Sequence, residues 1–343
     1  MNHNIFENII SLESLFLAWN KFKVGKGKRK DVQLFARFLE ENICQLHRDL
    51  ISGTYKHGDY YSFTVYDPKR RHIHTANIRD RIVHQSIYSE LTKIFEPKFI
   101  FHSYSCRIGK GTHKGVLALA KMTRKISRNY TKPCFALKCD IKKCFDNVDH
   151  RILLSIISKR IKDNRAIRLI NCVISSYCIN YPELDNVKGI PLGNITSQIF
   201  INIYMNELDQ YIKHKQQIKY YLRFSDDFVF LADNKEYLVN LIPVVQAFLN
   251  NSLKLNLHPQ KIIFRKLHQG IDFLGYIIFP KFFLIRNKTK KRMFKKLNSK
   301  LFAYLNGNLE LDALDQSLQS YLGILSHANA YKLSRRLIEE VKL

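Results

Sequence analysis

The chain has 343 residues, of which 46% are hydrophobic and 25% are charged. This balance is typical of a folded globular protein and excludes a disordered chain. Lys and Arg total 56 against 29 Asp and Glu, so the formal net charge is +27. Self-repulsion of this size does not help a chain to fold. It therefore indicates a polyanionic partner, with nucleic acid favoured over a membrane surface.

Two further features of the composition bear on location. No run of about 18 apolar residues occurs, which excludes a membrane-spanning helix, and the N-terminal segment lacks the basic start and small-residue cleavage site of a signal peptide. The seven cysteines are scattered and form no Cys-x-x-Cys pair, which predicts reduced thiols rather than a zinc site. We therefore expect a cytoplasmic protein.

Apolar residues at helical spacing, and one stretch of aromatic and β-branched residues, predict the elements of the N-terminal part. The turn signal Asp67-Pro68 is followed by three basic residues, which predicts a hairpin with a basic tip. The predicted elements are helices over 5–22, 32–51 (capped by Asp31) and 79–95, and strands over 60–66 and 72–75.

The central part alternates short apolar strands with helices, and the C-terminal part is helical and basic. Segment 288–296 is basic, and the interleaved Phe294 and Leu297 predict an amphipathic helix. The mixture of elements predicts the α+β class. The predicted strands are 134–140, 220–225, 228–232, 262–264 and 273–278, and the predicted helices are 150–161 (capped by Asp149), 165–177, 196–214 and 238–249.

Adjacent carboxylates at Asp226 and Asp227 lie between two apolar strands. A turn selected for stability would use Asn-Gly or Asp-Gly, because like charges repel. A divalent cation removes the repulsion, and few carboxylate ligands suit Mg²⁺; a solvated acidic turn is the alternative. Asp140 ends another strand. If that strand pairs beside the hairpin, the carboxylates can hold two metal ions about 4 Å apart for an in-line phosphoryl transfer.

Aromatic and histidine side chains near these segments have two interpretations each. Phe145 follows Asp140 beyond a predicted bend, where its ring could lie under a sugar and exclude a 2′-hydroxyl, or could pack in the core. His72 and His74 alternate on one face of a strand, but no third metal ligand is evident nearby. Surface or RNA-contacting histidines are therefore favoured over a zinc site.

Several segments together resemble the ordered motifs of one enzyme family, the reverse transcriptases. The following segments resemble motifs A to E, in order: LKCDIKKCFDNVDH, GIPLGNITSQIFINIYMNELD, YLRFSDDFVF, LKLNLHPQK and DFLGY. The match covers about residues 10–340. Within the family, the chain most resembles the reverse transcriptases of diversity-generating retroelements. That resemblance is carried by GNITSQ after Ile-Pro-Leu, by SYSCRIGKGTHKG and by HGDYYSFTVYDPKRRHIH.

The resemblance implies a right-hand polymerase fold and RNA-directed DNA synthesis. Fingers with an N-terminal extension would span 1–133, a palm 134–280 with a helical insertion at 151–188, and a thumb 281–343. Two Mg²⁺ ions, with Mn²⁺ as a substitute, would serve as cofactors. The implied partners are a template RNA, the RNA–DNA hybrid, dNTPs and a small basic accessory protein.

The resemblance also assigns roles to individual residues. Asp140, Asp226 and Asp227 would be the catalytic, metal-binding aspartates, and the backbone carbonyl of Ile141 would also contact metal. The nucleotide would be bound by Lys69, Arg71, Phe145 (the steric gate), Leu192, Gly193, Gln198 and Lys261, and the primer grip would be Phe273, Leu274, Gly275 and Tyr276.

Two departures from the family pattern affect the expected chemistry. The usual Tyr-x-Asp-Asp begins with Phe224 here, which keeps the ring and loses the hydroxyl. Leu192 replaces the Gln that often precedes Gly193, and an aliphatic residue there is characteristic of the diversity-generating group. A polar group that would hold the nucleotide is missing, which predicts misincorporation opposite template adenines.

Two other functions stay open. One is a defence-associated or retron-type reverse transcriptase, which the neighbouring genes would distinguish from the diversity-generating type. The other is a non-catalytic nucleic-acid-binding scaffold, against which the intact carboxylates argue. We expect no RNase H, integrase or maturase domain within 343 residues, so nuclease functions would come from elsewhere.

Overall fold

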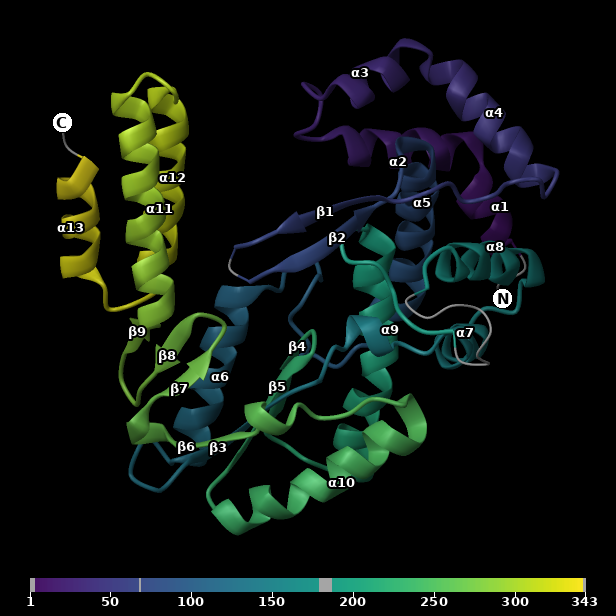
Figure 1. Ribbon diagram of the computed structural model, residues 1–343. Coiled ribbons are helices and arrows are strands. Elements are labelled where there is room, and N and C mark those ends of the chain that lie inside the picture. The colour runs from purple at the N-terminus through teal and green to yellow at the C-terminus, as the bar shows by residue number, and fades with distance from the viewer. Residues whose placement is uncertain (1–3, 68, 179–186, 342–343) are drawn as a thin grey trace. The chain divides into compact units, whose positions relative to one another are not determined.

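The structure is a computed structural model that describes residues 4–67, 69–178 and 187–341 (Figure 1). Helices and short antiparallel strands confirm the predicted α+β class. The chain divides into two compact units. The first unit is Met1–Arg107, Asp140–Lys219 and Pro243–Pro259; the second is Ile108–Cys139, Tyr220–Ile242 and Gln260–Leu343. The predicted finger, palm and thumb boundaries stay predictions.

Helices form the N-terminal part of the first unit, and two predicted helices are each broken in two. Ser11 interrupts the first, because its hydroxyl accepts a hydrogen bond from Ser14 N at 3.2 Å and caps a new helix. Phe38 interrupts the second with a non-helical backbone. The helices are α1 (Ile5–Ile10), α2 (Leu12–Lys23), α3 (Lys30–Arg37), α4 (Leu39–Ile51) and α5 (Ile78–Phe95).

The predicted cap at Asp31 is wrong, since Arg29 occupies the N-cap of α3. Asp31 instead lies in the first turn, where its carboxylate forms an ion pair with Arg29 at 2.5 Å. That ion pair, which no helical periodicity could reveal, is the main cause that lowers the pKa of Asp31. A carboxylate in the first turn also suits the positive end of the helix dipole.

The predicted hairpin is present in the first unit. Strands β1 (Tyr61–Val65) and β2 (Arg71–Thr75) pair antiparallel, with Tyr61 opposite Thr75 and Val65 opposite Arg71. Pro68 of the predicted turn lies outside the described residues. The strands are largely exposed, so the hairpin depends on its attachment at the base rather than on a core of its own.

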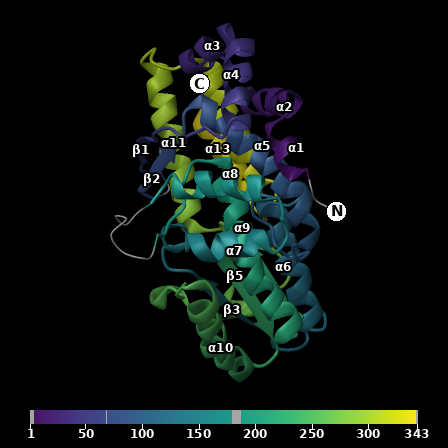
Figure 2. The ribbon, with the colours of Figure 1, turned by 90° about the vertical axis from the view of Figure 1, so that its right-hand side faces the viewer.

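The remaining helices of the first unit are α7 (His150–Ser158), α8 (Asn164–Ser175) and α9 (Ile195–Gln210), the last followed by a π-helical turn Tyr211–Lys215. Asp149 caps α7 as predicted, accepting from Ile152 N at 3.0 Å. Helix α9 is buried on nearly all sides, which explains its weak amphipathic pattern. It packs against α5 (Figure 2). Residues 179–186 of the predicted insertion lie outside the described part.

A four-stranded sheet forms the centre of the second unit, in the order β4-β5-β3-β6. Its strands are β3 (Phe135–Asp140), β4 (Tyr221–Phe224), β5 (Asp227–Ala232) and β6 (Ile263–Lys266). Four consecutive residues of β5 are buried, as a strand covered on both faces requires. Helix α6 (Thr112–Ile126) packs on β4 and β5. The boundary between the units falls directly before Asp140, the last residue of β3.

A three-stranded sheet replaces the single strand predicted over 273–278. Leu274 and Gly275 both have positive φ angles, +50° and +92°, and form a tight turn between β7 (Ile271–Phe273) and β8 (Tyr276–Ile278). The sheet is completed by β9 (Phe283–Ile285), which was not predicted. The following helices are α11 (Asn287–Leu305), α12 (Leu311–Leu325) and α13 (Tyr331–Val341), as the basic helical tail predicts.

Helix α10 (Lys235–Leu253) crosses the boundary between the units at Ile242. Short 3₁₀ turns complete the secondary structure: Glu96–Lys98, Phe145–Asn147, Pro259–Lys261 and Leu267–Gln269.

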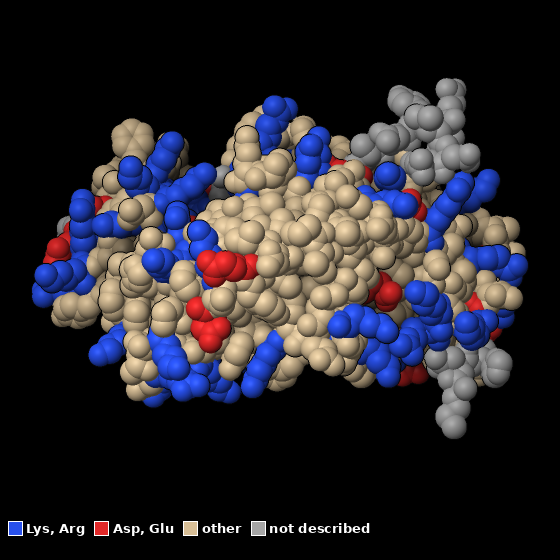
Figure 3. All heavy atoms as spheres, turned by 90° about the horizontal axis from the view of Figure 1, so that it is seen from below, with Lys and Arg blue, Asp and Glu red and all other residues tan. Residues whose placement is uncertain are grey.

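Surface charge, thiols and helix hydropathy agree with the composition. Lys and Arg side chains predominate over Asp and Glu on the face drawn in Figure 3. All seven cysteines are free thiols, as predicted. Within the described part of the chain, no helix is both long and apolar enough to span a bilayer.

Candidate active site

The hairpin β4–β5 carries the two adjacent carboxylates. Phe224 pairs with Asp227, so Ser225 and Asp226 form a two-residue turn and Asp227 begins β5. The predicted position at the hairpin is therefore confirmed. Ser225 has φ of +58°, a backbone strain that costs on the order of 1–3 kcal/mol and that the surroundings must hold. Such strain is frequent at functional turns.

Arg223 stabilises this turn through its buried side chain. Its side chain is 0% exposed, and Nη1 donates a hydrogen bond to Ser225 O at 2.9 Å. A buried guanidinium needs such partners, because an unpaired buried charge is costly. Our sequence reasoning did not single out Arg223. The available signal was one charged residue inside an otherwise apolar strand, a pattern that requires a buried partner.

Asp227 has a basic neighbour on strand β3. Lys138 Nζ lies 3.5 Å from Asp227 Oδ1, and the side chains are only 17% and 27% exposed. Solvent screens a pair this sheltered less than a surface pair. Lys138 and Asp140 alternate on β3, so they lie on the same face of that strand. Lys138 was not predicted to take part in the site.

The backbone around Asp140 is anchored on its C-terminal side. Asp140 O accepts from His258 N at 2.8 Å, and Ile141 forms an isolated bridge with Leu257. Ile141 is buried, at 1% exposure. These contacts fix the direction in which the chain leaves β3. Among residues 4–67, 69–178 and 187–341, no group of three or more His, Cys, Asp or Glu side chains is arranged to hold a metal ion.

The loop before α9 packs against strand β2 of the hairpin and hydrogen-bonds to it. Gly193 has φ of +121°, and a Cβ there would lie 2.7 Å from Ile73 Cγ2 and 3.1 Å from His74 O. His74 N also donates to Leu192 O at 2.8 Å. Only glycine permits this close approach of loop and strand. The predicted residues Leu192 and Gly193 are therefore brought next to β2, the strand that begins at Arg71.

Asn194 is the side chain that joins the loop to the hairpin, and sequence reasoning missed it. Its Nδ2 donates to His74 O at 2.8 Å, and its Oδ1 accepts from Ala76 N at 3.1 Å. The residue is 5% exposed, so water cannot replace these bonds. The side-chain amide of Asn194 thus pairs with the backbone at the end of β2, as a neighbouring strand would.

The other predicted residues of the first unit are accessible. Phe145 is only partly buried, and its carbonyl accepts from Ile190 N at 2.9 Å. Lys69 and Arg71 are exposed on the hairpin, and Gln198 is exposed on α9. Asp226, Asp227, Lys261 and the turn residues 273–276 belong to the second unit. The predicted roles of both sets stay predictions.

A buried polar network supports the start of α9. His84 Nδ1 lies 3.1 Å from Thr196 Oγ1, and His84 Nε2 lies 3.0 Å from His57 Nε2. Burial lowers the pKa of His84 to about 3, so its imidazole is neutral at physiological pH. Nearby, Tyr55 OH donates to Asp80 Oδ1 at 2.7 Å. The network positions the helix that follows Gly193.

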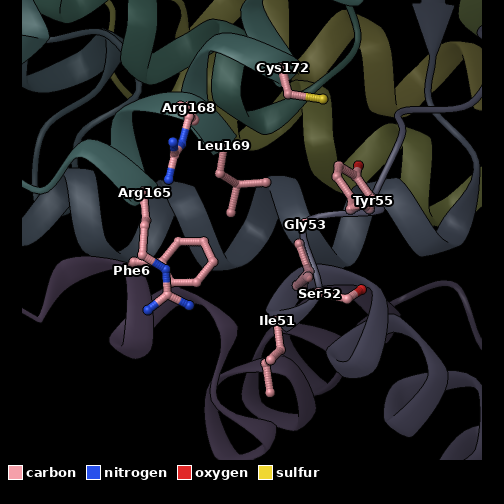
Figure 4. Close-up of a pocket in the computed structure, with 10 residues that line it drawn as sticks. Phe6, Ile51, Ser52, Gly53, Tyr55, Arg165, Arg168, Leu169 and Cys172 are labelled. Carbon is pink, nitrogen blue, oxygen red and sulfur yellow. The ribbon is translucent and has the colours of Figure 1, made fainter.

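Two histidines of the hairpin bond across it, and one cavity of the first unit lies away from the predicted site residues. His72 and His74 bond across the hairpin to Thr64 and Ser62. The cavity, of about 490 Å³, contains none of the predicted site residues (Figure 4). Its most prominent cation, Arg165, lies 4.0 Å from the Phe6 ring and pairs with Glu7 at 2.6 Å, so it has a structural role.

Comparison with known proteins identifies the family. Residues 62–278, more than half of the chain, match the family "Reverse transcriptase (RNA-dependent DNA polymerase)". The chain belongs to the reverse transcriptase family. The matched region contains the carboxylate turn and β3 as well as the loop joined to β2. Family membership supports the right-hand polymerase fold predicted from the motifs.

Individual relatives are distant. The chain is 24% identical over 340 residues to the group II intron-encoded protein LtrA of Lactococcus lactis subsp. cremoris (80% of this chain, 54% of that protein). It is 26% identical to protein YkfC of Escherichia coli K12 (69% of this chain, 71% of that protein). A telomerase structure from Candida tropicalis aligns with 15% identity and a TM-score of 0.47 over 66% of this chain and 53% of the telomerase.

The chain spans only part of the first curated relatives. It covers 54% of LtrA and 39% of the putative COX1/OXI3 intron 2 protein of Saccharomyces cerevisiae, to which it is 21% identical over 80% of its own length.

Proposed function

We propose that the chain is an RNA-directed DNA polymerase that copies a template RNA into DNA from dNTPs. The observation that carries this proposal is the strained hairpin turn that presents Asp226 and Asp227. The sheet order supports it, because β5, which begins at Asp227, is the neighbour of β3, which ends at Asp140. The match to the reverse transcriptase family supports it independently.

In this proposal Asp140, Asp226 and Asp227, with the carbonyl of Ile141, hold two Mg²⁺ ions, for which Mn²⁺ can substitute. The donors fit, because Mg²⁺ prefers carboxylate oxygens, keeps several waters and takes further ligands from substrate phosphates. A preformed cluster of three or more protein ligands is thus not required. When bound, the ions would lower the pKa of the attacking 3′-hydroxyl and neutralise charge on the triphosphate.

The chain's own residues would prepare that site. Lys138 balances the charge of Asp227 and orients its carboxylate, while Arg223 keeps the turn in its strained form. Lys69 and Arg71 would bind the triphosphate, and Phe145 would exclude a 2′-hydroxyl. The remaining roles proposed for the site are base and nucleotide contacts at Leu192, Gly193, Gln198 and Lys261, and a primer grip at Phe273, Leu274, Gly275 and Tyr276.

A biological role in mutagenic retrohoming is the finer part of the proposal. Leu192 supports it, because an aliphatic side chain beside Gly193 offers no hydrogen bond to hold the incoming nucleotide. We propose that misincorporation opposite template adenine is frequent and falls in Leu192→Gln. An unchanged error frequency in that variant, measured by single-nucleotide extension on an RNA template, would contradict this role. A template RNA, a small basic accessory protein and a cytoplasmic location complete the proposal.

Primer extension on an RNA template tests the activity itself. We expect extension by the wild type and its loss in Asp226→Asn, because the amide cannot replace a carboxylate as a charged ligand. Asp233→Asn is the matched control, since Asp233 is an exposed acid just beyond β5 in the same unit. Equal extension by wild type and Asp226→Asn, or extension by neither, would favour the non-catalytic scaffold.

A further inference from the structure

The segment that leads into the loop before α9 pairs with the turn over 142–148 that contains Phe145, here called the Phe145 turn. Ile190 N donates to Phe145 O at 2.9 Å, and Gly189 N donates to Val148 O at 2.9 Å. All four residues belong to the first unit. Gly189 has φ of +105°, a conformation that favours glycine. The position of the Phe145 backbone therefore depends on where this segment lies.

The Phe145 turn also has hydrogen bonds of its own. Asn147 Nδ2 donates to Lys142 O at 3.2 Å and to Lys143 O at 3.0 Å. These bonds join residues close together in the chain, so they fix the shape of the turn. They do not fix its place relative to the loop that contains Leu192. The bonds from Gly189 and Ile190 supply that place.

His150, the first residue of α7, anchors the segment through its side chain. Its ring Nε2 lies 2.6 Å from Gly189 O, and the residue is 5% exposed. A carbonyl oxygen can only accept, so Nε2 is the donor. Burial lowers the pKa of His150, which keeps the imidazole neutral and leaves Nδ1 as an acceptor. Gly189 thus accepts from the ring at its carbonyl and donates to the Phe145 turn at its amide.

The other ring nitrogen shows which feature of the histidine the fold uses. Nδ1 of His150 is buried and has no hydrogen-bond partner within the described part of the chain. A buried polar atom without a partner destabilises a fold. An apolar side chain of similar size would fill the position without this cost. What histidine adds here is therefore the Nε2 donor, directed at the carbonyl of Gly189.

We propose that His150 is a positioning residue for sugar selection. By holding Gly189, it fixes the segment against the Phe145 turn and so sets the place of the Phe145 ring beneath the sugar of the incoming nucleotide. The inference rests on the proposed function, in which Phe145 excludes a 2′-hydroxyl. It extends that function, because the same segment continues into Leu192. His150 itself touches neither the nucleotide nor a metal ion in this proposal.

The test compares His150→Leu with His150→Gln in the full chain. Leucine removes the donor, whereas the glutamine Nε2 lies the same number of bonds from Cα as the imidazole Nε2 and can donate to Gly189 O. His150→Asn, whose amide is one bond shorter, is a second variant without the donor. His47→Leu is the matched control, since His47 Nδ1 lies 2.8 Å from Ile10 O and this bond joins α4 to α1. Phe145→Ala provides the reference for an open gate.

Primer extension on an RNA template measures the ratio of kcat/KM for dNTP to kcat/KM for rNTP. The loss of one hydrogen bond corresponds to about five-fold, so His150→Leu and His150→Asn should each lower this ratio by about five-fold. His150→Gln and His47→Leu should keep the wild-type ratio, and Phe145→Ala should lower it further. A loss of stability alone would affect both nucleotides equally and would leave the ratio unchanged.

Two outcomes of this measurement would overturn the proposal. One is a wild-type ratio in both variants that lack the donor. The other is an equal fall in His150→Gln, because the ring and not its donor would then be required.

Hydrogen exchange provides a readout that needs no polymerase activity. The amides of Gly189 and Ile190 should exchange faster in His150→Leu than in the wild type or in His47→Leu, because the segment opens more often. Exchange at the wild-type rate would overturn the anchoring by His150. If the wild type extends no primer, the proposed function fails, and faster exchange in His150→Leu would still support the anchoring.

Discussion

Asn194 offers the sharpest test of how the fold prepares the nucleotide site. Its amide makes two buried hydrogen bonds, to His74 O and from Ala76 N. In Asn194→Ala both backbone groups lose their partner, at about 1 kcal/mol for each bond. This loss of about 2 kcal/mol weakens the attachment of β2, which contains Arg71, to the loop that contains Leu192 and Gly193.

If the two hydrogen bonds of Asn194 position these residues for the nucleotide, Asn194→Ala should raise the KM for dNTP more than it lowers kcat. A difference of about 2 kcal/mol corresponds to about 30-fold, which is the upper limit for the rise in KM. Single-nucleotide primer extension measures both constants. Asn171→Ala, at an exposed position of α8, is the matched control and should change neither.

The reasoning would be refuted by one clear pattern. If Asn194→Ala lowers the unfolding temperature but leaves the KM for dNTP at the wild-type value, then Asn194 only stabilises the first unit. Asn194→Asp separates the two bonds, because it keeps the acceptor for Ala76 N and places a carboxylate oxygen against His74 O. We expect this variant to raise the KM at least as much as Asn194→Ala.

Two other predictions concern buried groups. Arg223→Met should abolish extension and lower the free energy of unfolding by about 1–3 kcal/mol, because Ser225 O loses its donor. Urea unfolding measures the loss of stability, and a variant that still extends the primer would contradict the role of the turn. The pKa of His84 is about 3 when folded and near 6.5 when unfolded, so only the unfolded chain takes up a proton between these values. Stability is therefore complete above pH 6.5 and falls below it, by about 2 kcal/mol at pH 5. Urea unfolding of His84→Gln, which should lack this loss, provides the check.

The sequence by itself determined those features that depend on neighbouring residues. Asp149 begins α7 because its carboxylate reaches an amide three residues ahead, and no distant contact is needed. The carboxylate turn was predictable for the same reason, since two apolar strands flank it directly. The loop glycine at position 193 was found through its motif, although its cause is a close approach of β2.

Only the tertiary structure decided the features that join residues far apart in the chain. Asn194 acquires its role from backbone groups about 120 positions earlier, and Lys138 from a carboxylate on another strand. The break at Phe38 and the turn at Leu274–Gly275 likewise contradict the local hydrophobic pattern. Periodicity records which side of an element is apolar, but it carries no information about which distant group a polar side chain will meet. Such pairings depend on the packed arrangement of the whole unit.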